Sequence, residues 1–334
     1  MDSTKKFLDD VFFPYVLDNN ITAVVHGGDI VDRRKYINYN TAQRLRKDFL
    51  DPISNMGVDF HIIAGNHDIH LKETNQINAI DELIAGRYPS FHTYQNHAAE
   101  VMFDGTKILM MPWICEDNKK QIFNKIQNTD AKIGIGHLEL AGFELFRGSL
   151  PSHGEDRNIF SKFKMVMSGH FHHRSTDGQI FYLGSHMEFT WSDFDDPRGF
   201  HVFDTETNKL TFIPNPYIMF RKYFYNDVDE KPNLSKIDFS KYKDSILKII
   251  VKGKNDHNLY DKFIEKLEAH NPVEIQVVYD NASSEVVLTE DTIDDTESTV
   301  DIMKKHIMTY ETSVDKNKLE HHLIDLYNEA QSIS

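Results

Sequence analysis

The chain has 334 residues, of which 40% are hydrophobic and 27% are charged, and its formal net charge is −15. This composition is typical of a folded globular protein and excludes an intrinsically disordered one. The negative charge argues against a protein that coats nucleic acid nonspecifically, but it allows one that combines a local basic patch with bound cations. The single cysteine, Cys115, excludes an intrachain disulfide and fits a reducing compartment. No apolar run reaches the roughly 20 residues that span a membrane.

The first two thirds of the sequence alternate predicted helices with short apolar strands, which favours an α/β fold with sheets flanked by helices. Apolar residues recur at helical spacing in four segments: 4–19, 40–55, 77–85 and 118–128. Strands are predicted at 21–26, 60–64, 132–135, 165–167, 180–183, 199–204 and 209–213, with a hairpin formed by 101–103 and 107–111. We expect these elements to form one domain over residues 1–216.

The character of the sequence changes after Pro214-Asn215-Pro216. A strand (246–251), a helix (259–269) and a second strand (273–279) predict a small α+β capping domain within residues 217–282. The acid-rich residues 283–297 predict a solvated linker, and two amphipathic stripes in residues 298–334 predict a helical tail.

Polar side chains follow four of the predicted strands, and at each strand end a glycine precedes the first of them. Ligands bind at the carboxyl ends of strands in open α/β sheets, and glycine lets the backbone approach them closely. A carboxylate, an amide oxygen and imidazoles form a ligand set that suits Mn, Fe or Zn. Each residue alone would be an ordinary turn former or structural histidine, but together they predict a metal site. The residues are Asp29, Asn66, His67, His137, His170 and His172.

The motifs that carry these residues resemble the calcineurin-like metallophosphoesterase superfamily: Gly28-Asp29-Ile30-Val31-Asp32, Gly65-Asn66-His67-Asp68, Gly136-His137 and Gly169-His170-Phe171-His172. Two further stretches, Met111-Pro112-Trp113 and Asp196-Pro197-Arg198-Gly199-Phe200, are similar to the nuclease subunits of the SbcC–SbcD family and their T-even-phage counterparts. The resemblance covers residues 1–216 well. In the remaining residues the order of the predicted elements is similar to the family, but the sequence is less so.

The resemblance implies a two-metal site. Asp29 would bridge the two ions, Asn66, His137 and His170 would complete the ligands of one ion, and His172 would bind the other. Ions about 3.5–4 Å apart can clamp a phosphate and stabilise both the attacking and the leaving oxygen.

The resemblance also implies a catalytic pair, and the sequence itself offers candidate substrate contacts. His67 would contact the scissile phosphate and assist departure of the leaving group, held in place by Asp68. Asp32 occupies a position where many cellular members have a histidine near the phosphate. Arg33 and Arg34 start a basic run that is either a substrate contact or a solvated face.

The family further implies Mn²⁺-dependent hydrolysis of DNA phosphodiesters, with Mg²⁺ as a possible substitute, by an exonuclease or endonuclease subunit in double-strand-break repair, recombination and replication. Its partner would be an SbcC-type coiled-coil ATPase docked on residues 298–334, with the nuclease subunit forming a homodimer inside a heterotetramer. Such a protein would not be membrane-bound. It would act in the cytoplasm, and in the host cytoplasm if phage-encoded.

One departure from the family pattern leaves alternatives open. The family opens with a strand that ends in an Asp-x-His motif, and nothing of the kind precedes the helix at 4–19. The ion served by His172 would then lack two ligands in this sequence; either the true start lies upstream, or the strand comes from elsewhere, or the enzyme is impaired. One alternative is a catalytically impaired scaffold that docks the ATPase. Another is a protein phosphatase, because Gly28-Asp29-Ile30-Val31-Asp32-Arg33 also fits that branch, whereas the Gly-His-x-His element favours phosphodiesterases.

Overall fold

The computed structural model describes residues 3–143 and 154–279, with a few residues between 307 and 323. The chain divides into two units, Met1–Asp280 and Asn281–Ser334, and the elements below belong to the first. The predicted linker at 283–297 and nearly all of the predicted helical tail at 298–334 lie outside the described residues. No helix among the described residues has both the length and the apolar character needed to cross a bilayer.

Two sheets form the centre of the domain. The smaller is parallel, in the order β1-β2-β5. The larger has the order β10-β11-β9-β8-β7-β6, with parallel pairing from β11 to β7 and antiparallel strands at both edges. Their bounds are β1 (Ala23–His26), β2 (Asp59–Ile63), β5 (Phe91–Tyr94), β6 (Ala99–Phe103), β7 (Thr106–Met111), β8 (Ile133–His137), β9 (Met165–Gly169), β10 (Ser175–Thr176) and β11 (Ile180–Tyr182).

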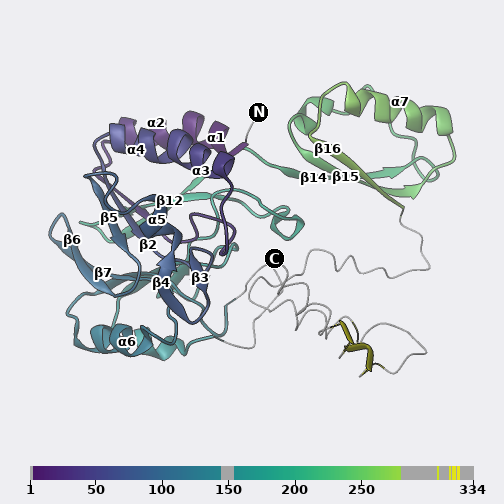
Figure 1. Cartoon of the computed structure of the whole chain (residues 1–334). Coiled ribbons are helices and arrows are strands. Elements are labelled where there is room, and N and C mark those ends of the chain that lie inside the picture. Colours follow the sequence, from purple (N-terminus) through teal and green to yellow (C-terminus); the bar gives the residue numbers. More distant parts are fainter. Residues whose placement is uncertain are drawn as a thin grey trace. The chain divides into compact units, whose positions relative to one another are not determined.

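Helices cover the outer faces of the two sheets, as Figure 1 shows. Ile63 of β2 packs with Ile135 and Met167 of the larger sheet in one apolar cluster between the sheets. The helices α1 to α5 pack on the smaller sheet, and α6 packs on the larger through Ile122 and Ile126. This arrangement confirms the predicted α/β class with helix-flanked sheets. The helical segments are α1 (Ser3–Phe7), η1 (Leu8–Phe12), α2 (Phe13–Asp18), α3 (Tyr39–Leu45), η2 (Arg46–Leu50), α4 (Asp51–Asn55), α5 (Ala79–Leu83) and α6 (Lys119–Asn128).

The two long predicted helices each contain one wide π-helical segment, η1 and η2. In both cases the segment ends just before a proline, Pro14 or Pro52. Proline lacks an N–H group and its ring clashes with the carbonyl one turn earlier, so a locally widened turn lets the helix continue.

Some predicted boundaries were wrong. The predicted helix at 77–85 begins only at Ala79, because the Asn78 side chain accepts from Asp81 N and caps it. Residues before it form the hairpin β3 (Ile69–Leu71) and β4 (Thr74–Asn78). Strand β5 was not predicted either, because its alternation of polar and aromatic residues is short.

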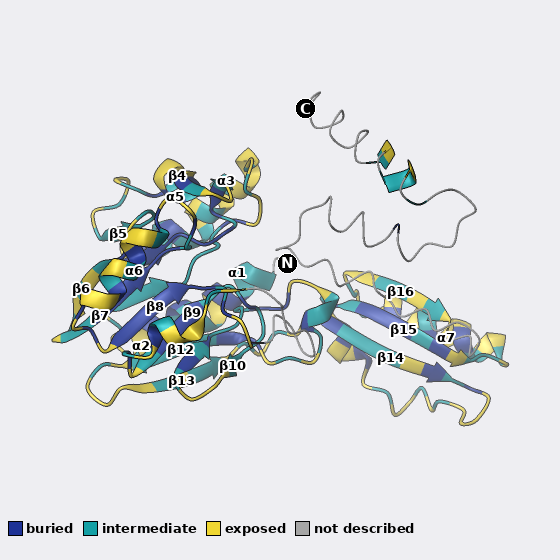
Figure 2. Ribbon diagram, turned by 90° about the horizontal axis from the view of Figure 1, so that it is seen from below, coloured by how far each residue is buried: buried dark blue, intermediate teal, exposed yellow. Residues whose placement is uncertain are grey.

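The C-terminal part of the first unit is a three-stranded parallel sheet, β14-β15-β16, with α7 on one face. Figure 2 shows its central strand, β15, as largely buried. The elements are β14 (Phe220–Asn226), η5 (Phe239–Tyr242), β15 (Ile246–Gly253), α7 (His257–Glu268) and β16 (Glu274–Tyr279). The prediction lacked β14. In the chain, η3 (Arg157–Phe160) lies between β8 and β9, whereas η4 (Trp191–Asp193) and the hairpin β12 (Gly199–Asp204) with β13 (Lys209–Pro214) lie between β11 and β14.

Candidate metal centre

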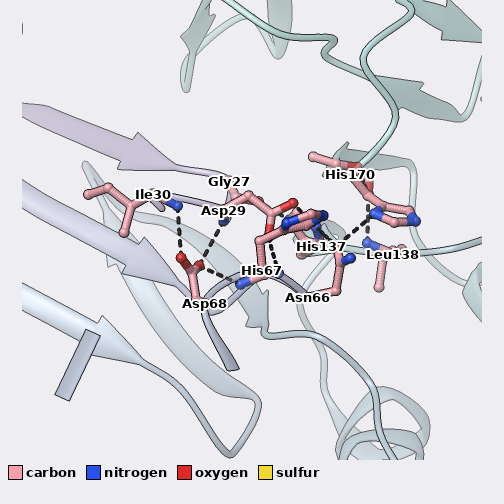
Figure 3. Close-up of polar contacts among 12 residues, drawn as sticks. Gly27, Asp29, Ile30, Asn66, His67, Asp68, His137, Leu138 and His170 are labelled. Carbon is pink, nitrogen blue, oxygen red and sulfur yellow. Dashed lines mark hydrogen bonds and ion pairs between the residues drawn. The ribbon is translucent and has the colours of Figure 1, made fainter. Parts of the chain in front are cut away.

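Four strand ends bring their polar side chains together (Figure 3). Asp29 follows β1, Asn66 follows β2, His137 ends β8 and His170 follows β9. Asp29, His137 and His170 each offer one ligand atom, and these atoms lie within 4.8 Å of one another. The two sheets thus contribute two side chains each, because the carboxyl ends of their parallel strands meet at the same edge of the sandwich.

The distances in this cluster suit a bound cation. His137 Nε2 lies 3.1 Å from Asp29 Oδ2 and 2.9 Å from Asn66 Oδ1. His170 Nδ1 is also 2.9 Å from Asn66 Oδ1. Ligand atoms that bind one ion at about 2.1 Å and at right angles are about 3 Å apart. The cluster therefore has the spacing of a ligand set.

The hydrogen bond of His137 to the backbone decides which of its nitrogens can bind a cation. Nδ1 lies 2.7 Å from the Gly27 carbonyl oxygen, which can only accept, so Nδ1 carries the proton and Nε2 a lone pair. That lone pair faces the oxygens of Asp29 and Asn66, and a cation between them would satisfy all three. The opposite orientation of the Asn66 amide would donate to these atoms and place its oxygen 3.0 Å from Arg34 Nη2.

The backbone at the cluster is strained in the way that functional sites often are. Asp29 has φ 55° and His170 has φ 84°, values that residues other than glycine rarely adopt. A Cβ atom on Gly28 would collide with His137 Nδ1, and one on Gly65 would lie only 2.7 Å from Asp29 Cγ. The glycines beside the ligands therefore permit the close approach of the strand ends.

Burial and the pairing of Asp29 with His137 shift the pKa values of the cluster. Burial disfavours the charge on Asp29, but the imidazoles of His137 and His67 outweigh burial and lower its pKa. Burial also disfavours protonation of His137, but Asp29 outweighs it and raises the pKa of His137. Burial, reinforced by His137, holds the pKa of His170 well below its ordinary value, so His170 is neutral near pH 7 and can act as a ligand.

Asp68 joins the two ligand-bearing loops instead of holding His67. Its Oδ2 accepts from the N–H groups of Asp29 and Gly65, both at 2.8 Å, and its Oδ1 accepts from those of Ile30 at 2.9 Å and Val31 at 3.3 Å. Burial and the Asp29 carboxylate raise the pKa of Asp68, while the N–H donors favour its charged form. Asp68 therefore does not make the expected contact with His67. It instead joins the two loops through backbone N–H groups, an arrangement called the staple below and drawn in Figure 3.

The His67 imidazole is held by a backbone group. The ring Nδ1 lies 2.6 Å from the Asp32 carbonyl oxygen, and the backbone N–H of His67 donates to Asp29 Oδ1 at 2.7 Å. The carbonyl oxygen can only accept, so Nδ1 carries a proton, and Nε2 faces away from this contact. The sequence gives no sign of this, because any residue at position 32 supplies the same carbonyl group.

The remaining predicted site residues lie at different distances from the cluster. Arg34 lies beside Asn66, as described above, whereas Arg33 is exposed and stacks on Tyr36 with its guanidinium 5.3 Å from the ring centroid. The Asp32 side chain is exposed. His172 is not among the residues that share the cluster, and its Nδ1 instead lies 3.8 Å from Asp193 Oδ1.

Trp113 contacts the cluster. Its ring centroid lies 5.3 Å from that of His170 and 6.0 Å from that of His137. It also lines a pocket of about 210 Å³ together with Glu139 and Glu155. The Met-Pro-Trp stretch could have indicated this position. It follows β7, which pairs with β8, and β8 ends at the ligand His137.

Comparisons with known proteins agree with this geometry. The family model described as calcineurin-like phosphoesterase matches residues 1–174. "Exonuclease subunit 1" of Enterobacteria phage T4 is 37% identical over 254 residues, which are 76% of this chain and 71% of the relative.

Two bacterial proteins that are named as subunits of the nuclease SbcCD are also similar. The one from Staphylococcus epidermidis is 31% identical over 105 residues, which are 28% of each chain. The one from Staphylococcus saprophyticus is 24% identical over 244 residues, which are 63% of this chain and 64% of the relative. The matched family model covers the four strand ends that carry the cluster. This chain belongs to the calcineurin-like phosphoesterase family.

Proposed function

We propose that this chain is the nuclease subunit of a DNA-processing complex and hydrolyses DNA phosphodiesters with bound divalent cations. The observation that carries the proposal is the convergence of Asp29, Asn66, His137 and His170 at one sheet edge. The names of the relatives, which are an exonuclease subunit and two nuclease subunits, support DNA as the substrate class.

The ligand set indicates which cation would bind. Oxygen donors mixed with imidazoles suit Mn²⁺, and Mg²⁺ would fit less well because it prefers oxygen ligands alone. When bound, such an ion polarises the phosphate and supplies a nucleophilic hydroxide near neutral pH. Asp29, with its low pKa, would carry the negative charge that holds the ion. A second ion would draw on His172.

His67 would act on the leaving group. The Asp32 carbonyl accepts from Nδ1–H, so the ring would act in its doubly protonated form and the Nε2 proton would pass to the departing sugar oxygen. Arg34, which lies beside Asn66, would contact a phosphate oxygen, and Arg33 with the Asp32 side chain would lie farther out along the DNA.

The assembly is part of the same proposal. Residues 298–334 would dock on the base of an SbcC-type coiled-coil ATPase, and residues 217–282 would help to position DNA. The nuclease subunit would form a homodimer inside a heterotetramer that acts in repair, recombination and replication of DNA. The complex would act in the cytoplasm, which would be the host cytoplasm if the protein is phage-encoded.

The test compares substitutions of two aspartates by measuring cleavage of labelled DNA. The full-length protein with Mn²⁺ should degrade linear duplex DNA, and Asp29→Asn should lower both the rate and the Mn²⁺ affinity by at least about 100-fold. Asp59→Asn is the matched control, because Asp59 is exposed on β2 and faces His92 instead of the cluster.

The outcomes separate three functions. Cleavage of DNA that Asp29→Asn abolishes supports the nuclease. Hydrolysis of a phosphopeptide with no action on DNA would replace it by a phosphatase. Mn²⁺ binding without hydrolysis of either substrate would leave a scaffold that docks the ATPase.

A further inference from the structure

The β14–β16 sheet has two faces, and α7 lies along only one of them, as Figure 1 shows. Leu247 and Ile249 of β15 belong to the apolar cluster that includes the buried side of α7. Side chains alternate along a strand, so Lys248, Ile250 and Lys252 point to the opposite face. This second face, called the open face below, consists of the side chains of the three strands that point away from α7.

An apolar row crosses the open face. The parallel register places Phe224 of β14 beside Ile250 and Ile250 beside Val278 of β16. Phe224 is 57% exposed, whereas Ile250 and Val278 are half-buried. Lys252 lies at one side of the row, with its Nζ 5.0 Å from the centroid of the Phe224 ring. Apolar side chains that gather on one exposed surface often mark an interaction site.

Aromatic rings and lysines continue at the other end of the open face. The Trp191 ring lies 4.8 Å from that of Phe220, the first residue of β14. Lys248 Nζ lies 4.1 Å from the Trp191 ring centroid, and Lys222 Nζ lies 4.3 Å from that of Phe194. These cation–π contacts fix two ammonium groups on the far side of the apolar row. Lys248 is buried, so it adds positive charge to the face but little contact surface.

The charge of the open face is opposite to that of the whole chain. Among the strand residues that point to it, the lysines 222, 248 and 252 outnumber one acid, Glu274, whereas the chain has a net charge of −15. A polyanion would therefore be attracted to this face in particular.

The mixture of an exposed ring and lysines indicates which polyanion fits. Proteins that bind single-stranded nucleic acid stack bases on aromatic side chains and contact the phosphates with basic ones. Duplex DNA presents phosphates too, but its base pairs hide the flat faces of the bases inside the stack. An exposed Phe224 ring with Lys252 beside it therefore suits a single strand better than a duplex.

We propose that the open face binds single-stranded DNA, with a base stacked on Phe224 and the adjoining phosphates held by Lys222 and Lys252. The inference rests on the proposed function, because it names the surface within residues 217–282 that would position DNA. It needs no metal ion, since none of these residues belongs to the Asp29 cluster.

The experiment measures binding of a fluorescein-labelled oligothymidine of about 16 nucleotides by fluorescence anisotropy. The full-length protein is used with EDTA, which removes divalent cations and so prevents cleavage. Phe224→Ala should raise the Kd about 10-fold or more, and Phe224→Tyr, which keeps a ring, should stay within about 3-fold of the parent. Tyr279→Ala is the matched control, because Tyr279 is 55% exposed on the same sheet but lies on the α7 side, beside Tyr260.

Replacement of Lys252 tests the phosphate contact. Lys252→Gln should raise the Kd and lower the slope of log Kd against log salt concentration by about 0.7, the value for one phosphate of a single strand. Lys262→Gln, which replaces an exposed lysine of α7, should leave the slope unchanged.

The outcomes separate this inference from the proposed function. An unchanged Kd for Phe224→Ala, or an equal loss for Tyr279→Ala, would overturn the open face as a binding surface, even if the parent cleaves DNA with Mn²⁺. Equal losses for Phe224→Ala on oligothymidine and on duplex DNA would overturn it too, because stacking requires unpaired bases. A parent protein that neither binds oligothymidine nor cleaves DNA would overturn the proposed function as well.

Discussion

The Nδ1 atom of His67 lies 2.6 Å from the backbone carbonyl oxygen of Asp32. The contact ties the loop after β2 to the loop after β1, and it leaves the opposite nitrogen of the ring available to substrate. A backbone acceptor cannot be removed by a side-chain change at position 32, so the orientation of His67 depends on the path of the chain and on Asp68, which staples both loops.

Replacement of His67 tests its proposed role as the group that assists departure. His67→Ala should lower the rate of DNA cleavage by about 10²- to 10⁴-fold, the usual contribution of general acid–base catalysis, and leave Mn²⁺ affinity nearly unchanged. Cleavage rate and Mn²⁺ titration are the two measurements. His92→Ala, on β5 against Asp59, is the control. A variant that cleaves at the parent rate would remove His67 from the mechanism.

Replacement of Asp68 tests the staple. Asp68→Ala leaves four backbone N–H groups in a buried site without their acceptor, so the free energy of unfolding should fall by about 3 kcal/mol or more. Asp68→Asn keeps one acceptor oxygen and should lose less. Urea denaturation of the two variants measures the difference, and equal stability of Asp68→Ala and the parent would contradict the staple.

Substitution of Gly65 tests whether the cluster needs its close backbone approach. The Cβ atom of Gly65→Ala would collide with Asp29 Oδ1 and Asp29 N, so the Asp29 carboxylate must move. We expect Mn²⁺ affinity to fall by about 100-fold or more. Gly86→Ala, which meets no atom within 4 Å, should bind Mn²⁺ like the parent even though its φ of +70° makes it strained.

The half-buried histidine at the end of β1 predicts acid sensitivity. His26 packs against Phe49 and Phe60, and burial lowers its pKa to about 4, below the ~6.5 of the unfolded chain. The unfolded state therefore binds the proton more tightly. The stability contributed by His26 is complete above about pH 6.5 and is lost as the pH falls toward 4, with about 2 kcal/mol lost at pH 5.

The measurement is the free energy of unfolding at pH 7 and pH 5. His26→Phe keeps the ring packing and removes the titration, so its stability should fall less over this interval. His257→Gln, on the exposed start of α7, should keep the slope of the parent. If His26→Phe loses stability as steeply as the parent, then other groups control the acid transition.

The sequence alone identified the donor atoms of the candidate site. The short apolar strands and the glycines after them predict chain turns at 27–28 and 65, and turns at the carboxyl ends of parallel strands place their next polar residues at one edge. Asp29, Asn66, His137 and His170 meet there because backbone geometry, which local residue patterns report, decides where strands end. The α/β class follows from the same local periodicity.

Only the tertiary structure decided the contacts that hold these residues. Asp68 reaches four N–H groups instead of His67, the Asp32 carbonyl holds the His67 ring, and Arg198 reaches residue 172. β5 and β14 were also invisible, because each is recognisable mainly through the parallel strand beside it. Such contacts join segments far apart in the chain, often through backbone atoms that every residue type shares, so packing of the sheets, and no local pattern, selects them.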